Sequence, residues 1–185
     1  MQISSLYDTE TGPWNRQLAS LVQFVRQYGE RQITSDSCRR LSRLTPEHLC
    51  QPGVSLLIAT VRGQNGRQLS GISFVSGYGM ESCLVAVHPY HRNKHTGTAL
   101  LTAQIFRLGN LECSVASDNL ASLKMCFNAG LIAVALKNGP TGKPTLLLRS
   151  PQNAGSNNLL PVDDVAQSDQ PITSQEGELL CRNPS

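Results

Sequence analysis

The stretch from Cys83 to Leu101 constrains the fold more than any other part of the chain. Its first residues, Cys83 to Val87, form a short apolar run that suits a strand buried on both faces. A polar, basic segment follows, from His88 to Gly97, with a proline near its start. Apolar residues then recur at helical spacing, at positions 100, 101, 105 and 108. The pattern predicts a strand, a turn and a helix in direct succession.

The turn in this unit is a predicted anion site. The first backbone N–H groups of a helix have no intrahelical partner, and the helix dipole places partial positive charge beside them. Arg92 and Lys94 add positive charge, as do His91 and His95 when protonated, and Gly97 lets a ligand approach the backbone closely. A strand that runs through such a turn into a helix therefore predicts phosphate binding.

A resemblance to a known family rests first on this turn. Val87-His88-Pro89, Arg92 and Gly97-Thr98-Ala99-Leu100-Leu101 resemble the coenzyme A loop of the GCN5-related N-acetyltransferase superfamily. In that family the loop reads Arg or Gln, two free positions, Gly, one free position, then Gly or Ala. Arg92 and Gly97 match this pattern, whereas His95 stands where the first glycine is usual.

A second block, from Val115 to Leu131, resembles the family's other signature. It has a valine at the end of a strand, Asn119 opening a helix, and Gly130 closing the helix before a hydrophobic residue. The order and spacing of the two blocks also fit. The resemblance implies an α/β fold in a single domain, with a mixed, mostly antiparallel sheet flanked by helices.

The expected domain covers residues 1–150. The resemblance to the family rests on the motifs over about 85–150 and on the order of predicted elements over 1–84. Residues 151–185 are rich in Gln, Asn, Ser, Asp and Pro and hold no aromatic residue, which predicts a polar, disordered tail. Leu159-Leu160 and Leu179-Leu180 in this tail could dock on the domain or on a second subunit, which leaves room for a homodimer.

Hydropathy patterns and turn residues place the remaining elements. Helices are expected at about 14–28, 98–108 and 118–130, with a short one after Thr45-Pro46. Strands are expected at about 2–6, 54–62, 69–75, 82–87, 111–115, 132–136 and 145–148.

The resemblance implies that acetyl-CoA is the acyl donor. Its pantetheine arm would pair like an added strand with the backbone of Val85, Ala86 and Val87. Asn119 would contact the cofactor from the second helix. The pyrophosphate would lie against the turn, at Arg92, Asn93, Lys94, His95, Thr96, Gly97 and Thr98. The implied reaction is direct attack by the primary amine of an unidentified acceptor on the thioester carbonyl, which makes the chain an N-acetyltransferase.

Three side chains are candidates for proton transfer. By spacing, Cys126 occupies the position where the family usually has a tyrosine that protonates the leaving thiolate. A thiol has an acidity close to that of coenzyme A, so Cys126 could donate this proton, or it could be a small apolar residue of the core. Glu81 and Glu112, before and within predicted strands, are candidate bases, or else exposed charges at strand edges.

Other interpretations compete with an active enzyme. His88, His91 and His95 are spaced like metal ligands, but no carboxylate or cysteine lies near them in sequence, so we expect no metal site. Because His95 replaces a glycine and the usual tyrosine is missing, the chain could instead be a degenerate module that binds coenzyme A, or acts through interactions, without transferring an acyl group. A nucleic-acid-modifying acyltransferase is a third interpretation.

Charge and cysteine content bear on partners and compartment. The 185-residue chain carries a net charge of +3, and residues 1–150 carry 15 basic and 8 acidic residues. This balance suits an anionic cofactor, and no basic helix or aromatic-rich basic face favours nucleic acid. Arg39, Arg40 and Arg43 favour an acidic acceptor, or form a solvated face. Six cysteines without a Cys-x-x-Cys pair, and no apolar run as long as a membrane span, predict a cytoplasmic protein with reduced thiols.

Overall fold

The computed structural model describes residues 1–6, 13–29, 33–64, 66–139 and 142–151. These residues belong to one compact unit, Met1–Gln152. The polar tail predicted for residues 151–185 lies outside the described residues apart from Pro151, which is exposed.

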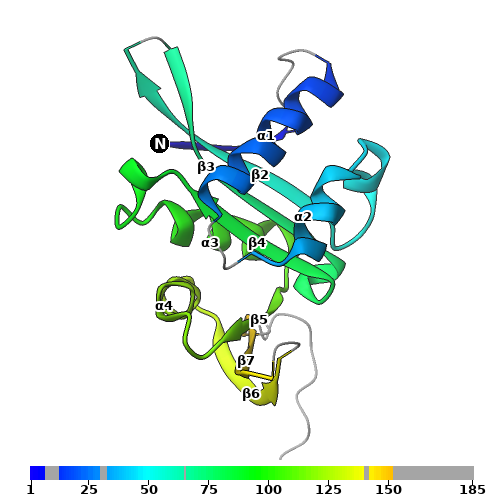
Figure 1. Cartoon of the computed structure of the whole chain (residues 1–185), viewed down its shortest axis with the longest axis vertical. Coiled ribbons are helices and arrows are strands. Elements are labelled where there is room, and N and C mark those ends of the chain that lie inside the picture. The colour runs from blue at the N-terminus through cyan, green and yellow to red at the C-terminus, as the bar shows by residue number, and fades with distance from the viewer. Residues whose placement is uncertain (7–12, 30–32, 65, 140–141, 152–185) are drawn as a thin grey trace, which may run out of the picture. The chain divides into compact units, whose positions relative to one another are not determined.

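The first sheet has four antiparallel strands in the order β1-β2-β3-β4 (Figure 1). Their bounds are β1 Gln2–Ser5, β2 Ser55–Gly63, β3 Gly66–Ser76 and β4 Ser82–Val87. β2 and β3 form the predicted hairpin, in which Gly63 pairs with Gly66. A 3-10 turn, Gly77–Gly79, connects β3 to β4.

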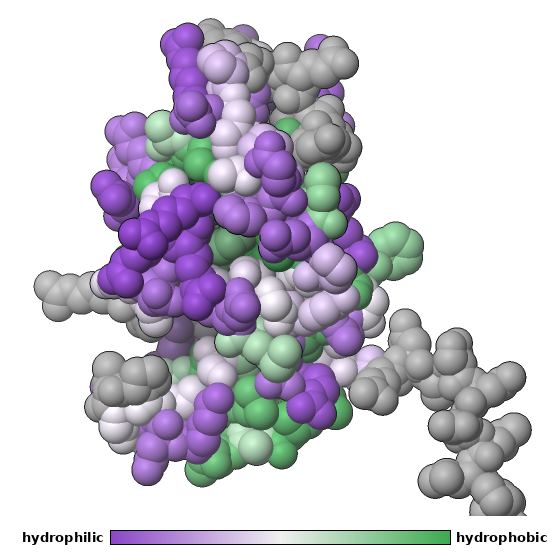
Figure 2. Space-filling view, turned by 90° about the vertical axis from the view of Figure 1, so that its right-hand side faces the viewer, coloured by the Kyte–Doolittle hydropathy of each residue, from purple (hydrophilic) through white to green (hydrophobic). Residues whose placement is uncertain are grey.

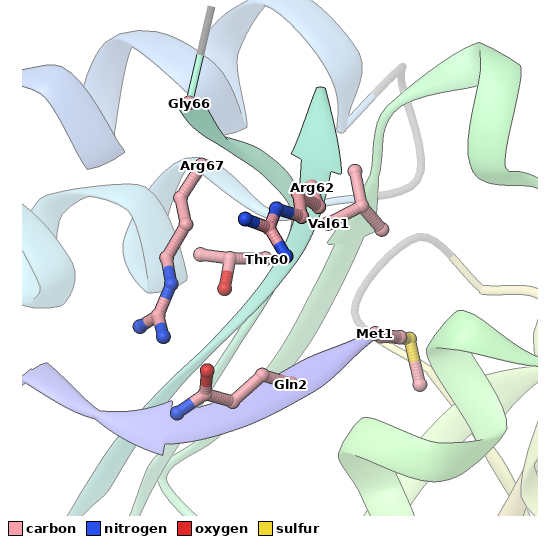
Figure 3. A pocket seen from close by; sticks show the side chains of 7 residues that line it. All are labelled: Met1, Gln2, Thr60, Val61, Arg62, Gly66 and Arg67. Atoms are coloured by element: carbon pink, nitrogen blue, oxygen red, sulfur yellow. The ribbon is translucent and has the colours of Figure 1, made fainter. Parts of the chain in front are cut away.

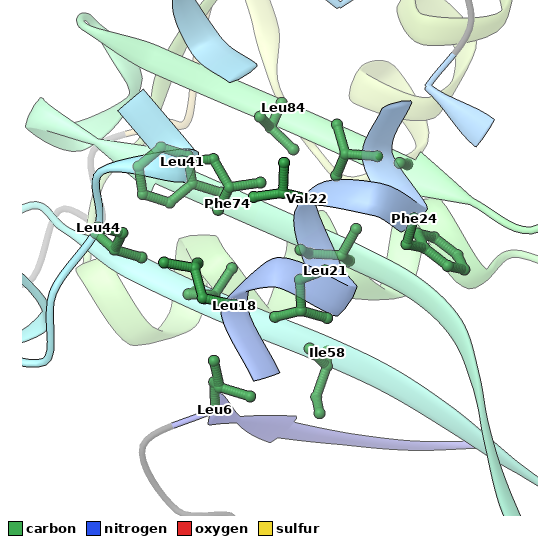
Figure 4. Packing of buried hydrophobic residues seen from close by; sticks show 14 residues of the cluster. Leu6, Leu18, Leu21, Val22, Phe24, Leu41, Leu44, Ile58, Phe74 and Leu84 are labelled. Atoms are coloured by element: carbon green, nitrogen blue, oxygen red, sulfur yellow. The ribbon is translucent and has the colours of Figure 1, made fainter. Parts of the chain in front are cut away.

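Two helices cover one face of this sheet. They are α1 (Trp14–Tyr28) and α2 (Ser35–Ser42). Side chains alternate between the two faces of a strand, so Leu56 and Ile58 of β2 and Leu84 of β4 point to this side. They pack with Leu18 and Leu41 of the helices in the larger of the hydrophobic clusters (Figure 4). Thr34 caps α2, because its hydroxyl oxygen accepts a hydrogen bond from the N–H of Ser37 at 3.2 Å.

The third helix, α3 (Thr96–Leu108), lies on the opposite face of the first sheet. The other residues of β2, Leu57 and Ala59, pack here against Leu100 of α3. The amide of Gln104, also on α3, donates a hydrogen bond to the carbonyl oxygen of Ser73 in β3 at 3.0 Å. The helix ends at Gly109, which has a φ of 76°, a conformation that favours glycine.

The second sheet has three antiparallel strands in the order β5-β7-β6. Their bounds are β5 Glu112–Ala116, β6 Ile132–Asn138 and β7 Pro144–Arg149. The fourth helix, α4 (Leu120–Asn128), precedes β6 in the chain. Leu123 and Cys126 of α4, Leu101 of α3, and Cys113 and Leu148 of the sheet form a second core.

The fold class expected from the sequence is confirmed, with two refinements. The described strands form two antiparallel sheets in place of one mixed sheet, because β4 and β5 do not pair. The segment around residues 35–42, for which no helix was predicted, forms α2, and the short helix expected after Thr45-Pro46 is a 3-10 turn at Glu47–Cys50. The other predicted helices and strands lie where the sequence placed them, within a few residues at their ends.

Candidate cofactor site

The central feature of the candidate site is an open strand edge. β4 pairs with β3 on one side, and among the described strands none pairs with its other side. The starts of β4 and β5 are held close by Gly79, where an added Cβ would lie 1.9 Å from the carbonyl oxygen of Glu112. Beyond this contact no ladder joins β4 to β5, so the backbone of β4 is available to an extended ligand.

Alternation along β4 shows which backbone groups face the open edge. The N–H of His88 donates to the carbonyl of Ser70 at 2.9 Å, which continues the β3–β4 ladder. In an antiparallel pair, alternate residues bond to the partner strand and the residues between them point away. Ala86 therefore bonds to β3, and the N–H and C=O groups of Val85 and Val87 point to the open edge. Of the three β4 residues predicted to pair with pantetheine, Val85 and Val87 have the required orientation.

The turn after β4 has the backbone shape of an anion site. Asn93 and His95 both have a φ of 58°, in the left-handed region that non-glycine residues seldom adopt. Left-handed residues placed among ordinary ones turn successive N–H groups to one side, as in anion-binding nests. Asn93, Lys94 and His95 are all exposed. His95 thus has a left-handed backbone, which glycine adopts most easily, and this accounts for the glycine that the family usually has at this position. The exposed side chain of His95 adds a basic group to the turn.

The first turn of α3 supplies further backbone donors. The first N–H of the helix to bond within it is that of Ala99, which donates to the carbonyl of His95 at 2.9 Å. The N–H groups of Thr96, Gly97 and Thr98 precede it and have no carbonyl four residues back in the helix. An added Cβ at Gly97 would lie 2.6 Å from the sulfur of Met125, so this glycine lets α3 approach α4. Gly97 therefore has a packing role beside the one predicted from the sequence.

Arg92 holds the turn in place. Its Nε donates to the carbonyl of Val87 at 3.2 Å, and its Nη2 donates to the carbonyl of Tyr28 at 2.9 Å. These bonds tie the turn to the end of β4 and to the last residue of α1. The sequence placed Arg92 at the pyrophosphate, and the structure adds an anchoring role for its partly buried side chain.

Asn119 begins α4 at the end of β5. Its Oδ1 accepts a hydrogen bond from the N–H of Ser122 at 3.2 Å, so the side chain caps the helix. The residue before it, Asp118, forms an ion pair with Lys143, and this interaction lowers the pKa of Asp118. The predicted contact of Asn119 with the cofactor would have to use the part of its amide that the cap leaves available.

Both candidate bases are paired with arginines. Glu81 accepts a hydrogen bond from the hydroxyl of Ser76 at 2.6 Å and from Arg40 of α2 at 3.1 Å. Glu112 accepts two hydrogen bonds from Arg149 of β7, at 2.7 and 2.9 Å. Glu81 therefore lies between α2 and the start of β4, whereas Glu112 joins neighbouring strands of the second sheet.

The basic cluster predicted on residues 39–43 is partly neutralised. Arg40 bonds to Asp36 at 2.9 Å as well as to Glu81, and Arg39 lies 3.7 Å from Asp36. The hydrogen bond from Arg40 lowers the pKa of Asp36, which favours its charged form. Net positive charge on this part of α2 is accordingly smaller than the sequence suggests.

Cys126 belongs to a group of three cysteines in the second core. Its Sγ lies 4.0 Å from that of Cys113, and both residues are buried. A hydrogen bond with Cys113 raises the pKa of Cys126, and burial raises it further. The pKa of Cys83, on β4, is raised for the same two reasons. A protonated, buried thiol of low acidity suits the core better than proton donation, and sequence reasoning did not foresee that the three thiols would meet.

His88, at the start of the turn, packs with aromatic rings. His88 lies edge-on to Tyr28, with 4.6 Å between ring centroids, and its Nδ1 accepts a hydrogen bond from the N–H of Tyr90 at 3.3 Å. Within the described part of the chain, no group of three His, Cys, Asp or Glu residues could hold a metal ion. His88 thus helps to join the turn to α1.

A separate pocket of about 530 Å³ lies at the far edge of the first sheet (Figure 3). Arg62 and Arg67 line it, opposite each other in the β2–β3 hairpin, together with Gln2 and Thr60. Two strands, β2 and β3, separate β1 from β4, so this pocket is not the candidate cofactor site. None of the helices in the described ranges is both long and apolar enough to span a bilayer.

Solved acetyltransferase structures share this fold. A ribosomal-protein-S5-alanine acetyltransferase from Vibrio fischeri gives a TM-score of 0.60 at 9% identity, over 84% of this chain and 95% of that one. The NatC complex bound to a Gag peptide and CoA gives 0.58 at 15% identity, over 82% and 99%. An aminoglycoside acetyltransferase in complex with coenzyme A and kanamycin gives 0.54 at 17% identity, over 82% and 94%. No protein-family model matches the sequence, and no curated protein matches it. The likeness establishes the fold, which is that of the GCN5-related N-acetyltransferases.

Proposed function

We propose that this chain, with the fold of GCN5-related N-acetyltransferases, is an acetyl-CoA-dependent N-acetyltransferase that modifies a primary amine. The observation that carries the proposal is the open edge of β4, which runs directly into a turn of exposed backbone donors. A ligand that carries phosphate groups would fit the turn, and an extended arm with amide groups on the same ligand would fit the open edge of β4. Coenzyme A is such a ligand, and the solved structures of this fold include complexes with coenzyme A and with acetyl-CoA.

The pyrophosphate would lie against the N–H groups of Thr96, Gly97 and Thr98. The exposed turn residues Asn93, Lys94 and His95 would surround it with backbone donors and positive charge. The pantetheine amides would bond to Val85, whose N–H and C=O face the open edge, with Val87 beside the turn. Ala86 would contribute packing, Arg92 would fix the turn, and Asn119 would approach from the start of α4.

The thioester would then lie toward the start of β4. From Ser82 to Val87 the strand rises about 17 Å at 3.3 Å per residue. An extended arm that begins at the turn therefore leads along β4 toward Glu81. At that end the acceptor nitrogen would attack the thioester carbonyl, forming the C–N bond as the C–S bond breaks and the thiolate of coenzyme A leaves. Holding both reactants in line lowers the barrier by removing the entropy cost of their encounter.

We propose that Glu81 accepts the proton of the attacking amine. Its carboxylate is oriented by Ser76 and by Arg40 of α2, and it lies just before β4, at the end toward which the extended arm would lead. For Glu112 and Cys126 the surroundings support structural roles, between β5 and β7 and in the second core respectively. Their catalytic roles stay predictions.

The acceptor is proposed only as a primary amine. The solved structures that share the fold act on different amines, since their names include aminoglycoside, spermidine and ribosomal-protein-alanine acetyltransferases. We also propose that the protein works in the cytosol, because the five cysteines in the described residues are free thiols.

A second candidate function is a coenzyme A-binding module that transfers no acyl group. The observation that favours it is that both candidate bases, Glu81 and Glu112, are engaged by arginines. Such a module would keep the open edge and the turn and would lack a group free to accept the proton.

Calorimetric titration followed by a thiol-release assay separates these functions. We expect acetyl-CoA and desulfo-CoA to bind, since the proposed contacts involve the phosphates and the pantetheine amides. Thiol release with at least one amine of a broad panel would support the transferase. Binding of both ligands without release for any amine would favour the module, and no binding of either would refute both functions. Arg67→Ala, in the pocket at the far edge of the sheet, is the matched control and should bind acetyl-CoA normally.

A further inference from the structure

Strand β6 leaves an entire sheet edge exposed. It is the outer strand of the second sheet, and every residue from Ile132 to Asn138 is exposed. Ile132, Val134 and Leu136 retain 51%, 43% and 67% of their surface. A strand that is apolar, at an edge and uncovered offers both unpaired backbone groups and hydrophobic surface to another chain.

β6 has few of the features that usually keep an edge strand from pairing with another chain. Such strands commonly carry charges or proline, or are bent by a bulge. β6 has a bulge between Ala133 and Ala135, but residues 132–136 include no charge and no proline. Figure 2 shows apolar surface gathered at the lower end of the molecule, at the height where Figure 1 places the second sheet. Phe127 of α4, five residues before β6, adds a large apolar side chain that is 47% exposed.

We propose that β6 pairs antiparallel with β6 of a second copy of this chain. The two second sheets would then form one continuous sheet across a twofold axis. A twofold interface brings the same surface together on both sides, so the strand must be complementary to itself.

The sequence of β6 meets this requirement. With the axis at Ala135, Val134 of one copy lies opposite Leu136 of the other, which gives apolar cross-strand pairs. The one charged residue, Lys137, then lies opposite Ala133, so the two lysines are at different ends of the ladder. Like charges directly opposite each other, which would disfavour self-pairing, are avoided.

The expected dimer is of moderate affinity. Stable protein interfaces bury about 1,200–2,000 Å², and two short strands alone supply less than this. We therefore expect dissociation in about the micromolar range. The proposal needs no cofactor and is independent of the transferase assignment.

Sedimentation velocity on the full chain, from low to high micromolar concentration, tests the proposal. A monomer–dimer equilibrium is expected, and Leu136→Lys should raise the dissociation constant at least about tenfold by placing a charge in the paired edge. Phe106→Lys is the control, because Phe106 is 92% exposed on α3, far along the chain from β6. Its dissociation constant should match the unmodified chain. Thermal midpoints of both variants show whether the fold is kept.

Three results would overturn the proposal. The first is a chain that stays monomeric throughout, and the second is a dimer weakened no more by Leu136→Lys than by Phe106→Lys. The third is slow amide exchange along β6 in dilute, monomeric protein, which would show that something other than a second copy covers the edge.

Discussion

Replacing Arg92 by alanine tests whether this side chain anchors the turn. The change removes hydrogen bonds to the carbonyls of Val87 and Tyr28, which join the turn to β4 and α1. Hydrogen bonds to charged groups contribute about 1.5–3 kcal/mol each, and the guanidinium is partly buried. We therefore take the lower end and expect the free energy of unfolding to fall by about 3 kcal/mol.

Urea unfolding and calorimetric titration with acetyl-CoA measure the two consequences. Arg92→Ala should lose stability and bind acetyl-CoA more weakly, because the turn is no longer held in one conformation. Arg92→Lys should recover only part of the stability, since an ammonium cannot reproduce the planar, two-donor geometry. Unchanged stability together with weaker acetyl-CoA binding would refute the anchoring role and indicate that Arg92 acts directly on the phosphates.

Three further substitutions probe other parts of the account. Glu81→Gln should lower kcat/KM by about 10²–10⁴, and a value within about tenfold of the unmodified chain would remove Glu81 as the base. Cys126→Ala should cost about 1 kcal/mol in urea unfolding and change kcat less than tenfold, whereas a hundredfold loss of kcat with intact acetyl-CoA affinity would make the thiol the acid. Gly79→Ala and Gly109→Ala both place a side chain at positive φ, which costs about 1–2 kcal/mol. Gly79→Ala should lose several kcal/mol more, because only its Cβ meets the Glu112 carbonyl, and equal losses would contradict that contact.

Local patterns along the chain predicted most of the fold. The apolar stripe of residues 14–28 corresponds to α1, and the run at 82–87 corresponds to β4 with the same bounds. These elements follow from side-chain periodicity, which a sequence displays directly. α2 was not foreseen because it is short and polar, with Ser37 and Leu41 its only buried residues. The sequence signals that could have revealed it are the cap at Thr34, Asp36 in the first turn, and Arg39 and Arg40 in the last turn.

The candidate site was predictable in location but not in detail. The positive φ values of Asn93 and His95 were not predicted. Asn and His adopt the left-handed conformation more often than most residues, but still only in a minority of cases, so residue type alone does not identify it. The partners of Arg92, Glu81 and Cys126 come from α1, α2 and β5, which are distant in sequence. Such partners depend on how the elements pack, so residue spacing alone could not identify them.

Amide hydrogen exchange at Val85 tests the open edge of β4 most directly. The N–H of Val85 points away from β3, whereas that of Ala86 belongs to the β3–β4 ladder. We predict that acetyl-CoA slows exchange at Val85, and at Thr96 to Thr98 in the first turn of α3, while Ala86 is slow with or without it. Acetyl-CoA that binds and leaves the exchange of Val85 unchanged would contradict the proposal that its pantetheine arm lies along this strand.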